Sequence, residues 1–285
     1  MPLVKVICRT VFSLITKACM LLFAFGAHAA EINGAKVLSG DDIEGGLIMA
    51  RTATGNVVTL DDAVIPAAAD GLFIIGFHRD SDKPVTIKIM QPDGTSQLTV
   101  LTPKQREYDI QRIDGLQKNM VTPPDSVIAR IKSDQAAVAA ARQQKAATGD
   151  FWQGIDWPVT GRISGVFGSQ RILNGNPRQP HYGIDIAAPQ GTPIQAPASG
   201  LVTLVKDLYF SGWTVIINHG LGLNSSFLHL DQVGVNTGDS VTRGDNIGTV
   251  GSTGRSTGPH LDWRLDWLGR RIDASLVAGP MPPAE

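Results

Sequence analysis

Three short segments of this sequence combine histidine and aspartate at spacings suited to metal binding or proton transfer. The first is His181-Tyr182-Gly183-Ile184-Asp185. If it forms a strand, His181, Gly183 and Asp185 share one face, because side chains alternate along a strand. The glycine then leaves space between an imidazole and a carboxylate, and both groups are metal ligands. We interpret His181 and Asp185 as candidate ligands of one metal ion.

The second segment covers residues 259–267 and alternates strictly between apolar and polar side chains. The apolar face carries Leu261, Trp263, Leu265 and Trp267. The polar face carries His260, Asp262, Arg264 and Asp266. His260 and Asp262 would stand about 6.5–7 Å apart along such a strand. We expect Arg264 and Asp266 to be solvated or to support the neighbouring ligands.

The third segment is Ser226-Phe227-Leu228-His229-Leu230. Alternation predicts that His229 leaves its strand on the side opposite Leu228 and Leu230. The remaining histidines of the exported chain, His78 and His219, are interpreted as structural, and His219 stands next to Gly220 after an apolar strand. We expect neither a phosphate loop nor the Gly-x-Ser-x-Gly nucleophile of a serine hydrolase.

Taken together, these residues resemble the LytM/lysostaphin-type zinc endopeptidase family. That family combines a His-x-x-x-Asp pair, a central His followed by Leu, and a Gly/Ser/Thr-rich stretch that leads into His-x-His. The corresponding residues here are His181 and Asp185, His229-Leu230, and residues 251–262. Nearby context agrees, in Phe167-Gly168, residues 183–189, residues 191–193 and residues 200–202.

The resemblance implies that His181 and Asp185 are zinc ligands and that His260 is a catalytic histidine. It also implies that His229 positions the attacking water or stabilises the developing oxyanion. The family's usual third ligand is the second histidine of His-x-His, and Asp262 occupies that place here. We therefore expect one Zn²⁺ per chain, bound by His181, Asp185 and Asp262.

The aspartate at position 262 changes the charge of such a site. One histidine and two aspartates neutralise Zn²⁺, whereas two histidines and one aspartate leave a charge of +1, so the metal polarises a carbonyl less. Two functions follow from the resemblance. The first is a zinc-dependent endopeptidase that cuts amide bonds in the peptide stems or cross-links of peptidoglycan. The alternative is a degenerate, non-catalytic relative that binds the cell wall or activates another wall hydrolase.

Residues 1–29 are interpreted as a secretory signal peptide. Basic residues precede an apolar run at 20–27, and Ala27-His28-Ala29 fits a cleavage site before Ala30. An uncleaved anchor is the alternative, although the run is shorter than the roughly 20 residues of a spanning helix. Both cysteines lie in this segment, which excludes thiolate chemistry from the exported chain. We expect export to the periplasm or cell envelope, with no transmembrane span in the mature form.

The exported chain is predicted to be mainly β and to have three parts. Residues 30–115 form a small Ig-like β-sandwich, residues 116–153 a helical linker, and residues 154–285 an all-β LytM-type domain. The linker helix is expected to be capped by Thr122, to begin at Pro123 and to end near Ala147. Without residues 1–29, 22 basic residues face 26 acidic ones, which argues against nucleic-acid binding. The N-terminal domain is a candidate docking surface for an envelope protein.

Overall fold

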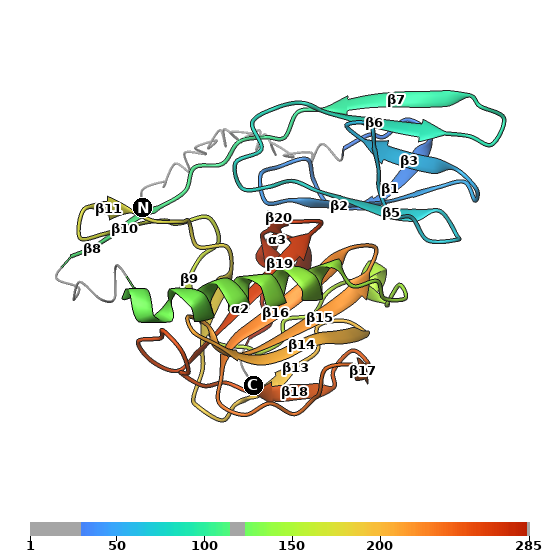
Figure 1. Cartoon of the computed structure of the whole chain (residues 1–285). Helices are drawn as coiled ribbons and strands as arrows, with labels where there is room; N and C mark the ends of the chain where they lie inside the picture. The colour runs from blue at the N-terminus through green and yellow to red at the C-terminus, as the bar shows by residue number, and fades with distance from the viewer. Residues whose placement is uncertain (1–29, 115–122, 284–285) are drawn as a thin grey trace, which may run out of the picture.

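The computed structural model describes residues 30–114 and 123–283. The predicted signal peptide and the predicted capping residue Thr122 therefore lie outside the described residues. Two β-rich domains are stacked on one another, and a long helix runs across the second (Figure 1). Within the described residues, no helix is long and apolar enough to cross a membrane.

The N-terminal domain consists of two antiparallel sheets packed face to face. The three-stranded sheet has the order β1 (Ala35–Ser39), β2 (Leu47–Thr52), β5 (Leu72–Gly76). The four-stranded sheet has the order β4 (Ala63–Val64), β3 (Val57–Leu60), β6 (Val85–Met90), β7 (Ser96–Leu101). Strand β6 alternates as its sequence predicts, with Val85, Ile87 and Ile89 buried. The predicted β-sandwich is confirmed.

The chain leaves this sandwich and pairs with the second domain before the helix begins. Strand β8 (Ile110–Ile113) runs parallel to β10 (Gln170–Leu173), and β10 forms a hairpin with β11 (Asn176–Pro177). Figure 1 shows these three strands beside one end of the helix. The N-terminal part of the chain thus contributes a strand next to the loop that carries His181.

Helix α2 spans Asp125–Gln143, which is shorter at both ends than its sequence predicts. Pro124 is the N-cap residue, with an extended backbone and no side-chain cap. Pro123 stands before another proline, which disfavours helical geometry at Pro123, so the helix does not begin there. At the other end Gln144 is extended, and its carbonyl accepts a hydrogen bond from Asn218 Nδ2 at 2.7 Å. This contact with the sheet replaces the next helical turn.

The C-terminal domain is built on an eight-stranded antiparallel sheet with the order β17-β14-β15-β16-β19-β12-β9, in which β20 also pairs with β19. Its strands are β9 (Arg162–Gly165), β12 (Ile184–Ala187), β14 (Gly200–Leu208), β15 (Gly212–Gly220), β16 (Leu223–Leu230), β17 (Ser240–Val241), β19 (His260–Trp267) and β20 (Arg270–Ile272). Smaller elements are β13 (Pro193–Gln195), β18 (Asn246–Thr249), the 3₁₀ helix η1 (Phe151–Gln153) and α3 (Ala274–Ala278). The predicted mainly β fold is confirmed.

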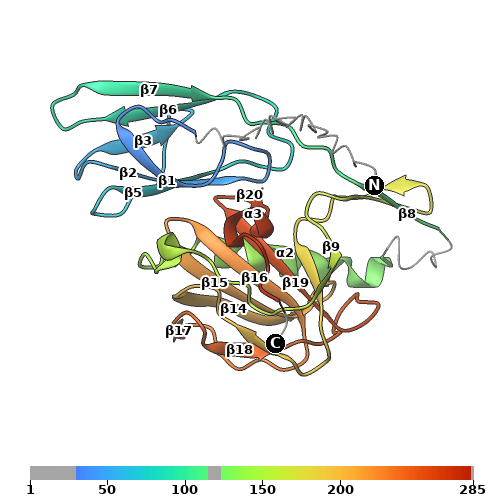
Figure 2. The same ribbon diagram turned by 180° about the vertical axis from the view of Figure 1, so that it is seen from behind.

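The two faces of the large sheet have different roles. One face packs into the core, where the rings of Trp263 and Trp157 meet edge to face at 5.5 Å. The other face is crossed by α2, which contacts β14 and β15 (Figures 1 and 2). Helix α2 therefore forms one wall of a space above the polar side of β19.

The two domains are joined by polar contacts on the side of β20 and α3. Arg106 pairs with the buried Asp273 at 2.9 Å, and Arg270 donates to the carbonyl of Gly76 at 2.9 Å. Arg79 donates to the carbonyl of Gly168 at 2.7 Å. Because Gly168 also donates its N–H to the carbonyl of His181 at 2.7 Å, the N-terminal domain braces the loop that holds this histidine.

Candidate metal centre

Strands β12 and β19 bring two carboxylates together. The register of this antiparallel pair sets Asp185 directly opposite Asp262, so both side chains stand on the same face. Asp262 is buried, with 3% of its surface exposed. Like charges placed opposite one another destabilise a sheet unless positive charge lies between or beside them. A cation next to Asp185 and Asp262 would therefore stabilise this strand pair.

His181 reaches this pair from the loop before β12. The strand begins at Ile184, three residues later than the alternation argument assumes. The backbone of His181 is held instead by Gly168 and Ser169, through bonds of 2.7 and 2.9 Å. A Cβ at Gly183 would lie 2.2 Å from Asp262 Oδ1. Glycine at this position therefore leaves room for the carboxylate.

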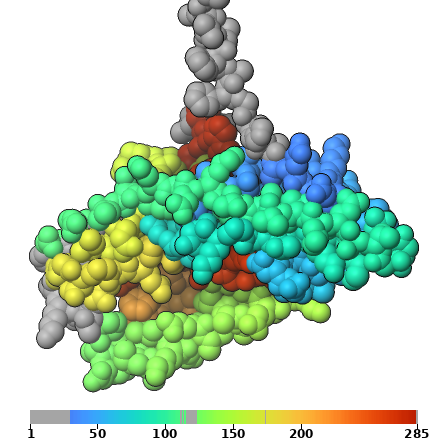
Figure 3. Space-filling model, turned by 90° about the horizontal axis from the view of Figure 1, so that it is seen from above, coloured from blue at the N-terminus to red at the C-terminus, as the bar shows by residue number. Residues whose placement is uncertain are grey.

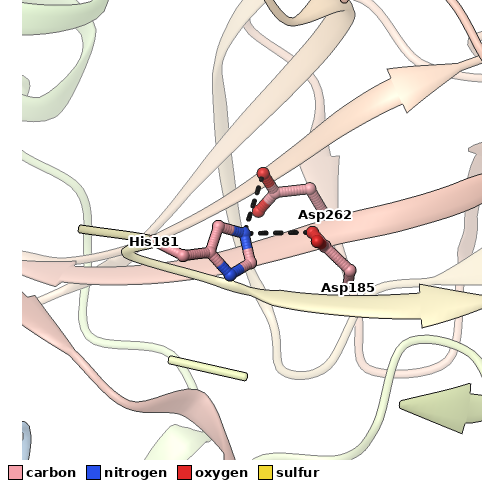
Figure 4. Close-up of side chains that lie close together, drawn as sticks. All are labelled: His181, Asp185 and Asp262. Atoms are coloured by element: carbon pink, nitrogen blue, oxygen red, sulfur yellow. Dashed lines mark ion pairs between the residues drawn. The ribbon is translucent and has the colours of Figure 1, made fainter. Parts of the chain in front are cut away.

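The three side chains converge on one point (Figure 4). Nε2 of His181 lies 3.0 Å from Asp185 Oδ1 and 3.5 Å from Asp262 Oδ2. One potential ligand atom from each residue lies within 4.8 Å of the others. Nδ1 of His181 faces the carbonyl of Val166 at 3.3 Å, which sets the proton on Nδ1 and leaves a lone pair on Nε2. The donor set is one nitrogen and two carboxylate oxygens, which suits zinc.

The buried Nε2 of His181 makes no hydrogen bond, despite its short distance to Asp185. A buried polar atom without a partner is costly, so its position between two carboxylates fits a metal ligand. Burial lowers the pKa of His181, but the adjacent carboxylates of Asp185 and Asp262 outweigh it and raise the pKa to about 9. The cluster therefore attracts a cation. Without a metal, a proton bound to His181 supplies the positive charge that offsets the two carboxylates.

Arg264 grips the third carboxylate from the same face of β19. Its Nε and Nη2 donate to Asp262 Oδ1 and Oδ2 at 2.9 and 2.5 Å, a bidentate pair. Burial raises the pKa of Asp262, but Arg264 and then His181 outweigh it and hold that pKa well below its usual range. Asp262 is thus ionised and fixed in orientation.

Asp266 is buried rather than solvated, which corrects one of the two expectations for this residue. It is 1% exposed and lies 3.3 Å from Arg271 and 3.9 Å from Arg142. Arg142 belongs to α2. The helix therefore covers the polar face of β19, which the alternation of that strand alone would leave in solvent.

His229 reaches the site through a β-bulge, which corrects the alternation argument for this residue. Between Val215 and Trp213 of β15, strand β16 carries one extra residue. His229 has a positive φ of 66°, a conformation that is uncommon outside glycine. Leu228 pairs with Asp262, and both Leu228 and His229 line the same groove. Simple alternation would have placed them on opposite faces.

The imidazoles of His229 and His260 form a pair, with ring centroids 4.9 Å apart. Nδ1 of His229 lies 2.7 Å from the carbonyl of Thr253, and Nδ1 of His260 lies 2.8 Å from the carbonyl of Gly258. In the neutral form of each ring, the proton therefore lies on Nδ1 and the lone pair on Nε2. Nε2 of His260 lies 3.8 Å from Asp185 Oδ1, at the edge of the cluster. Burial lowers the pKa of His229, which favours its neutral form.

The loop before His260 contains a Gly-x-Ser-x-Gly sequence at residues 254–258, contrary to the expectation that this motif is absent. It is not a nucleophile elbow, because it leads into strand β19 rather than from a strand into a helix. Ser256 Oγ donates to the carbonyl of Gly258 at 2.7 Å and lies 3.2 Å from Nδ1 of His260. Ser256 therefore helps to position the imidazole.

The two remaining histidines have other partners. Both nitrogens of His219 are bonded, Nδ1 to the carbonyl of Ser199 at 3.0 Å and Nε2 to Ser225 Oγ at 2.8 Å. Burial lowers the pKa of His219 to about 4. His78 lies against Tyr182, with ring centroids 5.6 Å apart. Neither histidine lies in the cluster of His181, Asp185 and Asp262.

A groove of about 370 Å³ opens beside the cluster, under α2, and both Asp262 and His229 line it. Figure 3 shows a hollow between α2, in green, and the β10–β11 segment, in yellow. Five arginines line this groove: Arg142, Arg171, Arg255, Arg264 and Arg271. Sequence analysis named Arg264 as a possible support for the ligands but missed Arg142, Arg171 and Arg271, because these three come from separate elements and share no spacing. Arg255 alone lies within a quoted motif, the stretch 251–262.

Comparison with known proteins finds relatives of the C-terminal domain. Residues 179–274 match the family described as Peptidase family M23. Over 121 residues the chain is 39% identical to the peptidoglycan DD-endopeptidase ShyA of Vibrio cholerae. It is 40% identical over the same length to the DD-carboxypeptidase/endopeptidase Mpg of Neisseria meningitidis. Each match covers 42% of this chain but only 28% of the relative.

A solved structure shares the fold over both domains. A crystal structure from Pseudomonas aeruginosa, described as a "putative peptidase M23", superposes with a TM-score of 0.67 and 26% sequence identity, and the match covers 85% of this chain and 97% of that one. The resemblance to LytM/lysostaphin-type peptidases is thereby confirmed. The matched residues 179–274 include the cluster and both paired histidines.

Proposed function

We propose that this chain, whose residues 179–274 form a domain of peptidase family M23, is a zinc-dependent endopeptidase that hydrolyses amide bonds in peptidoglycan stems or cross-links. One observation carries the proposal: the unpartnered Nε2 of His181 faces the carboxylates of Asp185 and Asp262, beside two further imidazoles. The name of the relative ShyA, a peptidoglycan DD-endopeptidase, supports peptidoglycan as the substrate.

The metal would be bound by His181, Asp185 and Asp262, one ion per chain. The residues fit such an ion, because each ligand is oriented by a partner: Val166 for His181, Arg171 for Asp185 and Arg264 for Asp262. Zinc bound there would supply a Lewis acid that polarises the scissile carbonyl.

His260 is proposed as the general base. Its Nδ1–H is bonded to the carbonyl of Gly258, so Nε2 carries the lone pair that accepts a proton from the attacking water. The same nitrogen can then return the proton to the leaving amine. Its distance of 3.8 Å from Asp185 places it next to the cluster without occupying a ligand position.

His229 is proposed to position the water. The resemblance allows either this role or stabilisation of the oxyanion, and the hydrogen bond from Nδ1 to Thr253 favours the first. Nε2 of the neutral ring accepts a hydrogen bond and has none to give to an oxyanion. The lowered pKa of His229 keeps the ring neutral.

Arg264 offsets the charge consequence of aspartate at position 262. Two carboxylates and one neutral imidazole would cancel the charge of Zn²⁺, but the guanidinium of Arg264 adds a positive charge within 2.9 Å of Asp262. The site with its bound metal thus regains the net +1 of a two-histidine, one-aspartate centre. This compensation supports an active rather than a degenerate site.

The second candidate function is a non-catalytic protein that binds the wall or activates another hydrolase. The bidentate pair with Arg264 favours it, because both oxygens of Asp262 already have a cationic partner. Under this alternative Arg264 replaces the metal, and the purified protein binds zinc weakly or not at all.

Metal analysis and wall digestion together test the proposal. The purified chain should contain about one zinc and should release peptide fragments from isolated peptidoglycan. The His260→Ala variant should keep its zinc and lose about 100-fold to 10,000-fold in rate. Lys88→Ala, on the outer side of β6, is the matched control and should digest normally. Undiminished digestion by His260→Ala would remove the catalytic assignment.

Export to the periplasm or cell envelope is part of the proposal, because peptidoglycan, the substrate in the name of ShyA, lies outside the cytoplasm. The mature chain should then begin at Ala30. Intact-mass analysis of protein recovered from the producing cell's envelope fraction checks this. Full-length protein in the cytoplasmic fraction would contradict it. Docking of an envelope protein on the N-terminal domain stays a prediction.

A further inference from the structure

The groove beside the metal centre carries far more positive than negative charge. We use the name cationic groove for the surface lined by Arg142, Arg171, Arg255, Arg264 and Arg271. These residues come from α2, β10, the loop before β19, β19 and β20. Long-range folding, rather than one basic motif, gathers them.

Three carboxylates pair with this set: Asp185, Asp262 and Asp266. Five guanidinium groups therefore face three carboxylates, which leaves two positive charges without a counter-charge. A divalent metal in the neighbouring cluster would raise this excess further. A buried or half-buried excess of positive charge favours an anionic ligand.

Arg255 is the clearest member of that excess. Among the described residues it has no carboxylate partner, and its guanidinium lies over the ring of Phe210 at 4.5 Å. Its backbone N–H bonds to the carbonyl of Phe210 at 2.8 Å, which fixes the loop. Partial burial and the charges of Arg171, Arg178 and Arg264 lower the pKa of Arg255. The neighbouring guanidinium groups therefore repel the positive charge of Arg255, and an anion bound between them would relieve this repulsion.

The other arginines of the groove have ion-pair partners, but some of their N–H groups make no hydrogen bond. Arg171 reaches Asp185 only at 3.5 Å, and its Nε is buried without a hydrogen bond. Nε of Arg142 is likewise buried without a hydrogen bond, whereas Nη1 of Arg271 lies 3.3 Å from Asp266. A buried N–H group without a hydrogen bond costs free energy, so an acceptor bound in the groove would be stabilised by these donors.

The position of the groove next to the metal centre indicates the chemical class of the ligand that would bind there. Asp262 and His229 belong to the metal centre and also line the groove, so a peptide bound at the centre continues into it. A volume of about 370 Å³ suits a short segment of such a peptide. The planar fork of arginine matches a carboxylate in two parallel hydrogen bonds.

We propose that the cationic groove binds a free carboxylate of the peptide substrate, with Arg255 and Arg171 as the carboxylate-binding residues. This rests on the proposed endopeptidase function and specifies its substrate: a peptide with an ionised carboxylate within a few residues of the scissile amide. Arg255 binds substrate only, whereas Arg171 also orients Asp185 through the contact at 3.5 Å.

Binding without turnover tests the assignment. The probe is a fluorescently labelled peptide of stem composition, made once with a free C-terminal carboxylate and once as the C-terminal amide. Fluorescence polarisation is measured on the full exported chain carrying His260→Ala, which prevents cleavage. The free acid should bind about 10-fold more tightly than the amide, the scale of one charge-assisted bidentate pair.

Substitutions then locate the preference. Arg255→Gln and Arg171→Gln, each added to His260→Ala, should abolish the difference between acid and amide. Arg162→Gln, an exposed arginine in β9 of the same domain and outside the groove, is the matched control and should preserve it. Unchanged thermal unfolding midpoints would show that the variants are folded.

Three results would overturn the assignment. They are equal binding of acid and amide, a preference that survives Arg255→Gln, or displacement of the acid by inorganic phosphate at lower concentration than by the unlabelled acid. The last result would identify a phosphate site instead. Binding is measured without turnover, so the two proposals can fail separately. A preference for the acid in a chain that does not digest the wall would support the groove assignment and contradict the endopeptidase function. Wall digestion without that preference would do the opposite.

Discussion

Two regions of the C-terminal domain each bury a histidine, with opposite consequences. At the end of β15, His219 has both nitrogens bonded to neutral partners, and burial lowers its pKa to about 4. Before β12, His181 has one nitrogen on a carbonyl and the other between two carboxylates, which raise its pKa to about 9. The partner of the second nitrogen decides whether a buried imidazole supports the fold or attracts a cation.

The largest expected effect is the loss of wall digestion in His181→Ala, and His219→Ala is its matched comparison. His181→Ala removes a proposed ligand, so wall digestion should fall by about 1,000-fold or more, the loss of several kcal/mol of metal catalysis. His219→Ala should keep its zinc, but its free energy of unfolding should drop by about 2–4 kcal/mol, since two buried hydrogen bonds are lost. Digestion rates and urea unfolding measure the two effects. Zinc loss from His219→Ala would break the comparison.

Zinc affinity should depend strongly on pH. The raised pKa means that metal-free His181 holds a proton below about pH 9, and zinc must displace it. Affinity should therefore rise about 10-fold per pH unit, or about 100-fold from pH 6 to 8. The same proton stabilises the metal-free fold below pH 6.5, and that contribution is lost as the pH rises through about 9. Competition with a chelator measures the affinity, and a flat profile would contradict the account.

Asp262→Asn should lower zinc affinity by about 10-fold to 100-fold, because an amide oxygen replaces a charged ligand. Asp266→Asn is the matched control on the same face of β19, two positions beyond Arg264, and should leave zinc affinity unchanged. Isothermal titration with zinc measures both. Equal affinities for Asp262→Asn and the parent chain would remove Asp262 from the ligand set.

Arg264→Gln gives the smallest expected effect and distinguishes the two functions. If Arg264 restores positive charge to an active centre, its loss should reduce the digestion rate by about 10-fold while zinc stays bound. If Arg264 instead replaces the metal, its removal should create zinc binding that the parent chain lacks. Metal content and digestion rate, measured on the same preparations, separate these outcomes.

The alternation of residues 259–267 predicts the part of the site that lies on β19. It places His260 and Asp262 on one face of a strand, and the structure has them there, with Asp185 opposite Asp262. The buried state of Asp266 does not follow from that pattern, because α2 covers the face and the pattern within one strand carries no information about a distant helix.

His229 shows a second limit of prediction from sequence. Its place in the site depends on one extra residue in β16 and a positive φ, and neither glycine nor asparagine marks the bulge. The cationic groove shows a third, since its five arginines come from five separate parts of the chain. Short motifs with a fixed spacing are predictable, whereas sites assembled by tertiary packing require the fold.

The central claim is that His181, Asp185 and Asp262 bind one divalent cation. Diffraction from zinc-soaked crystals on both sides of the zinc absorption edge tests it most directly. The account predicts one anomalous peak about 2.0–2.2 Å from His181 Nε2 and from a carboxylate oxygen of each aspartate. No peak at this position, with Arg264 still holding both oxygens of Asp262, would contradict it.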